Sequence, residues 1–239
     1  MFSIICIYND QNILNDYLLH SLMKQTVPYE LIAIDNSQQQ YKSAPRIMNE
    51  VGMMAKHDYI MFVHQDVALE TETWLEDVER ELKELEFLGA AGVAGCDHEG
   101  TVANVMHGTP PSFVTIKQIT KPVTKQTLDG CLIIIPKKVF EEIHFDEKTC
   151  DGWYLYASDY CLDLLRNDLK IYVLPDKIYH LSLGPSYSQM YIDAVNKIIK
   201  KHRGHFKIIY TTTGIWDTRK YLFQIGIIQI KKALQRLFC

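Results

Sequence analysis

The sequence lacks the features that mark several large classes of protein. No apolar run approaches the roughly 18 residues that a membrane-spanning helix needs. The chain begins MFSIICIYND, which has neither the basic segment nor the cleavage site of a secretory signal. The formal net charge is −4 at pH 7, so no strongly basic surface for nucleic acid is indicated. We therefore expect a cytoplasmic protein that does not bind nucleic acid.

Paired cysteines are also missing. The chain has 6 cysteines, none of them in a CxxC pair. A structural zinc site usually needs thiolates at such spacing, so zinc is not expected. Most of these cysteines lie in apolar runs, which predicts buried free thiols of the kind that persist in the cytoplasm.

Glycine-rich phosphate loops are absent as well. The sequence contains neither GxGxxG nor GxxxxGK[ST], so the dinucleotide fingerprint and the P-loop are excluded. The segment YNDQN after the first apolar run is neither basic nor rich in glycine. This argues against a nucleotidyltransferase on a related α/β fold, which we considered as a third possibility.

What is present is an alternation of strands and helices over the first hundred residues. Short apolar runs predict strands, and apolar side chains at helical spacing predict helices. Strands are expected at 2–8, 30–34, 59–63 and 90–96, and helices at 12–24, 44–56 and 75–85. Because the strands are almost continuously apolar, we expect a mainly parallel sheet with helices on both faces.

The second half of the chain is less regular. Glycines and prolines predict a loop-rich segment at 97–126. A strand at 128–135 is interrupted by Asp129 and Gly130, and further elements are expected as helices at 158–168 and 187–202 and as strands at 171–174 and 178–181. Residues 221–239 are apolar with interspersed basic side chains. They predict a helix that packs on its own domain or forms a homodimer, or one that lies peripherally on anionic lipid.

Polar residues follow three of the predicted strands. These are the pairs Asn9-Asp10, Asp35-Asn36 and Gln65-Asp66. In open α/β sheets, ligands bind outside the carboxyl ends of the strands. One polar strand end is routine, but three at the same edge indicate a ligand-binding site.

Longer segments resemble a known family. SIICIYND, ELIAIDNS, YIMFVHQDV, LDGCLIIIPKKVF and IYHLSLG occur in that order and resemble the family 2 inverting nucleotide-sugar glycosyltransferases over residues 2 to 185. The HQDV variant is similar to the glycosyltransferase-like family named after a streptomycin-biosynthesis protein. The resemblance implies an α/β GT-A fold, with a mixed, mostly parallel sheet flanked by helices. It implies a nucleotide-binding half at 1–96, a donor and acceptor half at 97–203, and a C-terminal amphipathic helical extension at 204–239.

The resemblance also implies an activity: inverting, metal-dependent transfer of a sugar from a nucleoside-diphosphate sugar, of the UDP or dTDP type, to a hydroxyl of a glycan or glycoconjugate. Asn9, Asp10, Asp35 and Asn36 match positions that contact the nucleoside. His64, Gln65 and Asp66 replace the family's DxD motif, and Asp66 is expected to bind Mn²⁺ or Mg²⁺ and the diphosphate, since such ions prefer carboxylate oxygen. His180 is either a second metal ligand or a structural histidine.

Five further residues in or near these segments are candidates for the site. Asp159 matches the catalytic base that takes the proton of the acceptor hydroxyl, although an aspartate in the first turn of a helix can also be only a favourable charge. Asp129 and Gly130 are expected to contact the donor sugar or to form a β-bulge. Trp153 and Tyr154 offer aromatic faces to the acceptor, with core packing as the alternative for Trp153.

The sequence departs from the family in this region. Members commonly read GWHFYD where this chain has GWYLYA at 152–157. Tyr154 therefore occupies the histidine position, and Ala157 occupies an acidic position. These departures motivate a second hypothesis, a catalytically inactive nucleotide-sugar-binding or scaffold protein with the same fold.

Overall fold

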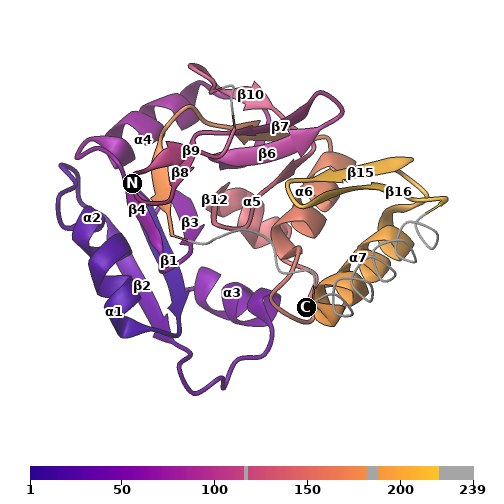
Figure 1. Cartoon of the computed structure of the whole chain (residues 1–239), viewed down its shortest axis with the longest axis horizontal. Coiled ribbons are helices and arrows are strands. Elements are labelled where there is room, and N and C mark those ends of the chain that lie inside the picture. The colour runs from indigo at the N-terminus through magenta and orange to yellow at the C-terminus, as the bar shows by residue number, and fades with distance from the viewer. Residues whose placement is uncertain (116–117, 182–187, 221–239) are drawn as a thin grey trace.

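The computed structural model describes residues 1–115, 118–181 and 188–220 (Figure 1). Its largest element is a seven-stranded sheet with the strand order β10-β13-β5-β12-β3-β1-β2. The strands of this sheet are β1 (Phe2–Tyr8), β2 (Glu30–Asp35), β3 (Tyr59–Val63), β5 (Leu88–Gly92), β10 (Val123–Thr124), β12 (Leu132–Pro136) and β13 (Lys170–Val173).

The central sheet is mixed. Strand β1 pairs in parallel with β2 and β3, and β13 pairs in parallel with β5, whereas β12 is antiparallel to both β3 and β5. The GT-A α/β fold with a mixed sheet is thereby confirmed. The strand expected at 90–96 differs, because Val93 separates β5 from β6 (Ala94–Asp97), and β6 belongs to another sheet.

Helices cover both faces of the central sheet. They are α1 (Gln11–Leu14), the π-helical segment η1 (Asn15–Leu19), α2 (His20–Leu22), α3 (Ala44–Gly52), α4 (Trp74–Glu84), α5 (Lys137–Glu142), α6 (Tyr156–Arg166) and α7 (Gln189–His202). Ser43 caps α3 by accepting a hydrogen bond from the Arg46 backbone N–H, and Pro45 suits the first turn, where no intrahelical donor is needed.

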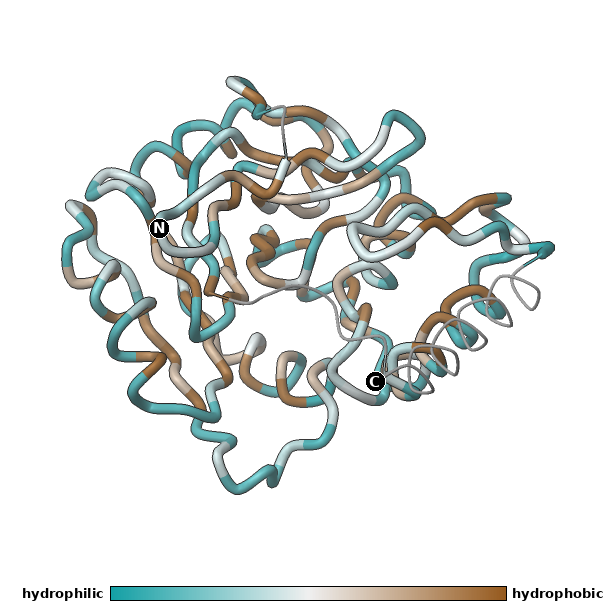
Figure 2. The backbone as a smooth tube through the Cα atoms, in the orientation of Figure 1, coloured by the Kyte–Doolittle hydropathy of each residue, from teal (hydrophilic) through white to brown (hydrophobic). Residues whose placement is uncertain are grey.

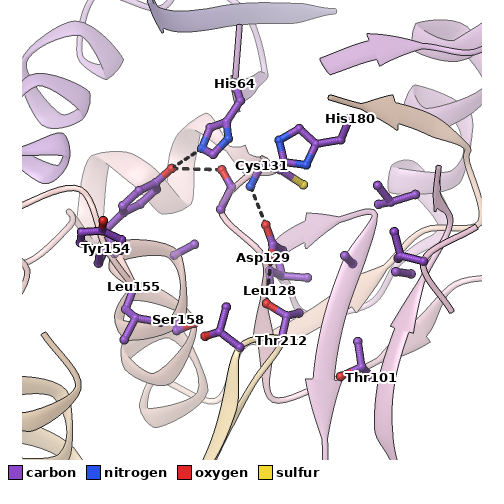
Figure 3. A pocket seen from close by; sticks show the side chains of 18 of the residues that line it. His64, Thr101, Leu128, Asp129, Cys131, Tyr154, Leu155, Ser158, His180 and Thr212 are labelled. Atoms are coloured by element: carbon purple, nitrogen blue, oxygen red, sulfur yellow. Dashed lines mark hydrogen bonds between the residues drawn. The ribbon is translucent and has the colours of Figure 1, made fainter. Parts of the chain in front are cut away.

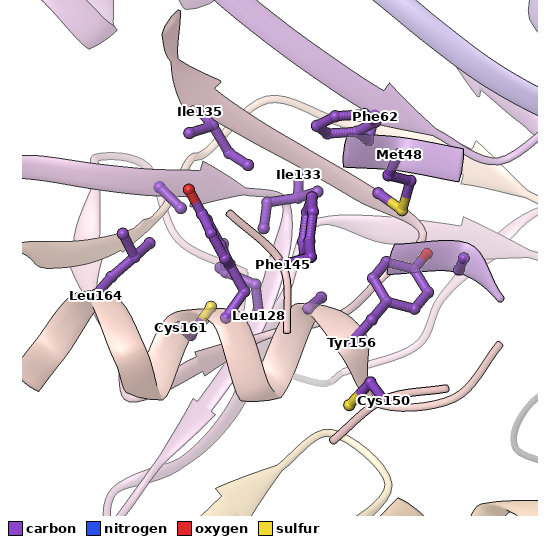
Figure 4. Close-up of a cluster of buried hydrophobic side chains, with 14 of the residues drawn as sticks. Met48, Phe62, Leu128, Ile133, Ile135, Phe145, Cys150, Tyr156, Cys161 and Leu164 are labelled. Carbon is purple, nitrogen blue, oxygen red and sulfur yellow. The ribbon is translucent and has the colours of Figure 1, made fainter. Parts of the chain in front are cut away.

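Two buried hydrophobic clusters fill the space between sheet and helices. One contains side chains of α1, η1, α2 and α4, and the other contains side chains of α3, α5, α6 and α7. Figure 2 shows hydrophobic stretches along the inner strands, and Figure 4 shows the second cluster, in which Phe62, Ile133 and Phe145 lie against α6. Alternate residues of β3 face opposite clusters, as the period of a strand requires: Phe62 lies in one and Met61 in the other.

Three smaller sheets surround the central one. Their strands, in spatial order, are β11 (Thr127–Leu128), β6 and β7 (Gly100–Ala103); β4 (Val67–Leu69), β14 (Ile178–His180), β8 (Val105–His107) and β9 (Ser112–Phe113); and the hairpin β15 (Ile208–Thr211) with β16 (Gly214–Asp217). The segment predicted to be loop-rich at 97–126 thus contains short strands.

The C-terminal extension was expected to be helical from residue 204, and this is wrong for 208–217. Those residues form the β15–β16 hairpin, because Ile209 and Trp216 bury their side chains against the second cluster while the strands pair with each other. The helix expected at 221–239 lies outside the described residues, so its membrane or dimer contact stays a prediction. Within the described part of the chain, no helix is long and apolar enough to cross a membrane.

Candidate active site

The carboxyl ends of β1, β2 and β3 form a polar edge that we call the rim, made of residues 9–10, 35–36 and 64–66. Gln65 connects the end of β3 to the end of β1. Its Oε1 accepts hydrogen bonds from the backbone N–H groups of Asn9 (2.8 Å) and Asp10 (3.0 Å), and its Nε2 donates to Asn9 Oδ1 (2.7 Å). These hydrogen bonds fix two parts of the rim relative to each other, so Gln65 positions Asn9 and Asp10.

The two acidic residues expected at the nucleoside have local partners. Asp10 caps α1, with its Oδ1 accepting from the N–H groups of Asn12 and Ile13. Asp35 is exposed, and the hydrogen bond from the Ser37 N–H holds the pKa of its carboxyl below the usual value. Both are compatible with a ligand at the rim, and their nucleoside contacts stay predictions.

Asn36 is the buried member of the rim, with 7% of its surface exposed. Its side chain closes the loop after β2: Oδ1 accepts from the Tyr41 N–H at 2.9 Å, and Nδ2 donates to the Tyr41 carbonyl at 3.0 Å. This loop brings Tyr41 next to Asn9 and Asn36 in the wall of a cavity. The described geometry thus pairs an aromatic ring with amide groups, a combination suited to a nucleobase.

Three side chains converge at the end of β3. His180, from β14, places its Nε2 3.3 Å from Asp66 Oδ1, and its ring centroid lies 5.7 Å from that of His64. One ligand atom from each of these three residues lies within 4.8 Å of the others. The antiparallel pairing of β14 with β4 puts His180 opposite Val67 and so beside Asp66.

The electrostatics of this cluster keep Asp66 ionised. Burial raises the pKa of the Asp66 carboxyl, but the imidazoles of His180 and His64 outweigh burial, so the pKa lies below its usual value. Burial and the neighbouring His180 lower the pKa of His64, so its ring is neutral at pH 7. A carboxylate beside two imidazoles is a set of donors that can bind a divalent cation such as Mn²⁺.

The Nε2 atom of the His180 ring is buried and makes no regular hydrogen bond among the described residues; its nearest polar neighbour is Asp66 Oδ1, at 3.3 Å. A buried polar atom that is poorly hydrogen-bonded is costly, and a metal ion is one way to satisfy it. The three residues therefore fit a divalent cation.

Tyr156 orients His64. Its hydroxyl donates to the Gly130 carbonyl at 3.0 Å and lies 3.3 Å from His64 Nε2. Figure 3 shows the dashed line that reaches the His64 ring. Because the hydroxyl proton is used on Gly130, His64 Nε2 is assigned as the donor to the hydroxyl oxygen. This tautomer leaves the lone pair on His64 Nδ1, which can then serve as a ligand atom.

Two cavities meet at this cluster. The rim cavity, of about 560 Å³, is lined by Asn9, Asn36, Tyr41, Gln65 and Asp66. The hairpin cavity, of about 630 Å³, is lined by Asp129, Gly130, Tyr154, His180 and Thr212. The residues that line both are His64, Trp153 and Tyr156. An elongated ligand can therefore extend from the rim past the cluster into the second cavity.

A comparison with protein families shows to which family the chain belongs. Residues 3–202 match the model of a family described as "Glycosyltransferase like family". The chain belongs to this glycosyltransferase-like family. No curated protein matches the sequence.

Solved structures give the same fold for this member of the glycosyltransferase-like family. S. aureus TarS has a TM-score of 0.56 and 16% identity over 84% of this chain and 39% of its own. GalNAc-T7 with UDP, GalNAc and Mn²⁺ has a TM-score of 0.60 and 12% identity over 84% and 47%. TarS 1–349 with UDP-GlcNAc has 0.56 and 16% over 84% and 66%. The chain thus spans less than half of these TarS and GalNAc-T7 chains.

Within this family fold, Asp159 has a setting that the sequence did not suggest. Its carboxylate is 1% exposed, with Lys201 Nζ 2.8 Å from Oδ2 and His202 Nε2 2.8 Å from Oδ1. The neighbouring Ser158 lines the hairpin cavity, but Asp159 does not. Its assignment as catalytic base stays a prediction, and the described geometry gives it an ion pair with α7.

The Asp159 surroundings resemble a metal site only by their residue types. Asp159, Asp163 and His202 place potential ligand atoms within 4.8 Å of one another. The Lys201 ammonium already lies among them, at 2.8 Å from Asp159 and 2.5 Å from Asp163. This cation pairs with both carboxylates, so the group holds α7 against α6.

Sequence reasoning missed three functional candidates in this glycosyltransferase-like chain. Tyr156 links Gly130 to His64, and Thr212 donates from the hairpin to Asp129 Oδ2 at 2.6 Å. Thr213 also lines the hairpin cavity. Isolated hydroxyl residues carry no periodicity or charge signal, so only the fold shows that they meet at one site.

Proposed function

We propose that the protein transfers a sugar from a nucleoside-diphosphate sugar, of the UDP or dTDP type, to a hydroxyl of a glycan or glycoconjugate. The observation that carries this proposal is the junction of two cavities at Asp66, His64 and His180, at the carboxyl ends of the strands. A nucleoside in one cavity and a sugar in the other would place the diphosphate between them. The HQDV sequence further assigns the chain to the streptomycin-biosynthesis type of the family.

The nucleoside belongs in the rim cavity. Asn36 and Tyr41 offer amide and aromatic groups there, and Asn9 is held in place by Gln65. TarS bound to UDP-GlcNAc and GalNAc-T7 bound to UDP support a uridine nucleotide, since both share the fold of this chain. UDP is therefore the first donor nucleotide to test, followed by dTDP.

A divalent cation belongs at Asp66, with His180 and His64 as the imidazole ligands. When bound, such an ion supplies positive charge that stabilises a departing diphosphate. Asp66 is ionised and both imidazoles lie beside it, so the protein holds the ligand set ready. The Mn²⁺ present with GalNAc-T7 supports manganese as the first ion to test.

The acceptor belongs at the mouth shared by the cavities. Trp153 is 40% exposed there, and Tyr154 lines the hairpin cavity. Inversion needs a base that takes the proton of the attacking hydroxyl. Among the described residues that line the hairpin cavity, Asp129 is the only one with a carboxylate. For Asp159 to act as the base, its ion pair with Lys201 would have to open.

Two observations favour a second candidate function. Ala157 is buried where an acidic residue was expected, and the Asp159 carboxylate is paired with Lys201 and contacts His202. A protein that binds a nucleotide sugar without transferring it would tolerate both features. This second candidate shares the binding site with the first and differs only in chemistry.

Binding is tested by titration calorimetry with UDP, dTDP, ADP and GDP, each with and without Mn²⁺. We expect UDP or dTDP to bind in a metal-dependent manner, and Asp66→Asn to abolish the metal dependence, because the neutral amide is a much poorer ligand. A protein that binds none of these nucleotides would refute both candidate functions. Metal dependence that survives in Asp66→Asn would refute the ligand assignment.

Chemistry is tested by hydrolysis and transfer with a panel of UDP and dTDP sugars. Transfer, or slow hydrolysis of one donor, is expected for the enzyme. Nucleotide binding without turnover of any donor would support the second candidate, a protein that binds a nucleotide sugar without transferring it.

A further inference from the structure

The β15–β16 hairpin is a part of the site that the family match does not include. The family model ends at residue 202, whereas the hairpin spans Ile208–Asp217. Figure 1 shows it beside α6 and α7. Its two-residue tip, Thr212 and Thr213, nevertheless lines the hairpin cavity. Residues outside the family-matched range therefore form part of the wall of this cavity.

The base of the hairpin is firmly attached. Thr127 Oγ1 donates to the Tyr210 carbonyl at 2.6 Å, and Gln126 both donates to the Ile208 carbonyl (3.2 Å) and accepts from the Tyr210 N–H (2.7 Å). Trp216 is 3% exposed and packs in the core cluster. These contacts fix where the tip lies, so the position of Thr212 is set by the fold.

The tip fixes the Asp129 carboxylate. Thr212 Oγ1 donates to Oδ2 at 2.6 Å, and the Cys131 N–H donates to Oδ1 at 3.0 Å (Figure 3). Each carboxylate oxygen can accept two hydrogen bonds, so these two bonds do not use up its acceptor capacity. Asp129 and Thr212 both line the hairpin cavity, so the carboxylate borders the space in which a ligand would lie.

A carboxylate held in this way is suited to bind vicinal hydroxyl groups. It accepts two O–H donors at fixed positions, and charged acceptors make the stronger hydrogen bonds. A site built to bind a particular hydroxyl discriminates strongly against a ligand that lacks it. The side chain that fixes the carboxylate therefore influences which sugar is bound.

We propose that Thr212 is a positioning residue for sugar selection: it holds Asp129 so that the carboxylate accepts hydrogen bonds from hydroxyl groups of the donor sugar. This inference rests on the proposed function, because it takes the ligand to be a nucleoside-diphosphate sugar. It assigns the hairpin, beyond the family-matched residues, a role in choosing the donor.

The test compares two affinities of the same protein. Calorimetry with UDP and with UDP-GlcNAc, UDP-glucose and UDP-galactose gives the ratio of sugar-nucleotide to nucleotide affinity; the dTDP series is used if dTDP is the nucleotide bound. Thr212→Val removes the hydroxyl and keeps the shape. We expect it to weaken the preferred sugar nucleotide about tenfold and to leave the nucleotide unchanged, because only the sugar contacts Asp129. Thr212→Ser should restore the wild-type ratio.

Thr218→Val is the matched control. Thr218 follows β16, is 4% exposed, and donates to the carbonyls of Phe206 and Lys207, away from both cavities. It should lower the melting temperature without changing the affinity ratio. An unchanged ratio in Thr212→Val, or an equal change in Thr218→Val, would overturn the inference while nucleotide binding by the wild type still supports the proposed function. A wild type that binds no nucleotide would overturn both.

Discussion

Replacing Asp159 with asparagine separates a structural role from a catalytic one. The carboxylate is 1% exposed and contacts His202, which is 0% exposed. Removing one partner of a buried ion pair costs about 3–5 kcal/mol. Lys201 keeps Asp163 at 2.5 Å and Asp146 at 3.1 Å, and the amide can still accept a hydrogen bond, so we expect a smaller loss than this range, about 2–3 kcal/mol.

The assay for Asp159→Asn is thermal and urea unfolding combined with activity measurement. For a chain of this size, about 2–3 kcal/mol corresponds to a fall in Tm of roughly 4–12 °C. Asp163→Asn is the control, since Asp163 is 18% exposed and contacts Lys201 and Arg166 only at the edge of the cluster; its effect should be smaller. An unchanged Tm with a loss of turnover of about 10²–10⁴-fold would refute the structural reasoning and favour a general base.

Two further predictions concern other parts of the molecule. Burial and the facing Asp176 raise the pKa of Glu81 to about 7, and burial raises the pKa of Asp176 to about 6. Because the folded-state pKa of Glu81 is raised, its contribution to the free energy of unfolding is fully present below the unfolded-state pKa of 4.5 and is lost as pH rises through about 7. The Tm measured from pH 5 to 8 should therefore fall less in Glu81→Gln than in wild type. Curves of Tm against pH that run parallel for the two proteins would contradict this. The second prediction concerns two glycines. A Cβ at Gly130 would lie 3.0 Å from the Tyr156 hydroxyl, whereas one at Gly152 would meet nothing within 4 Å. Urea unfolding should therefore show Gly130→Ala destabilised by about 1–3 kcal/mol relative to Gly152→Ala, and equal stability of the two variants would contradict the close contact.

Much of the fold was predictable because it follows from local periodicity. The apolar runs at Phe2–Tyr8 and Tyr59–Val63 are central strands, and α4 (Trp74–Glu84) buries the face that its helical spacing indicated. What local patterns do not specify is pairing. The insertion of β12 between β3 and β5, and the departure of β6 into another sheet, depend on contacts between segments far apart in sequence.

The candidate site, too, was predictable only where local sequence patterns determine it. The rim was predictable because strand ends in a parallel sheet meet at one edge, and Asn9 and Gln65 indeed contact each other. The setting of Asp159 was not predictable, since its partners come from α7, 42 and 43 residues later. An aspartate in a first helical turn gives the same local signal whether it faces a substrate or a lysine.

The attachment of the hairpin has a consequence for the order of folding. The bonds from Thr127 to Tyr210 and from Thr212 to Asp129 each close a loop of 83 residues, whereas the strands that form the rim pair across shorter separations. Closing a longer loop costs more entropy, by an amount that grows slowly with loop length. The strand pairs that form the rim do not require the hairpin, whereas the wall of the hairpin cavity is complete only once these longer-range contacts have formed.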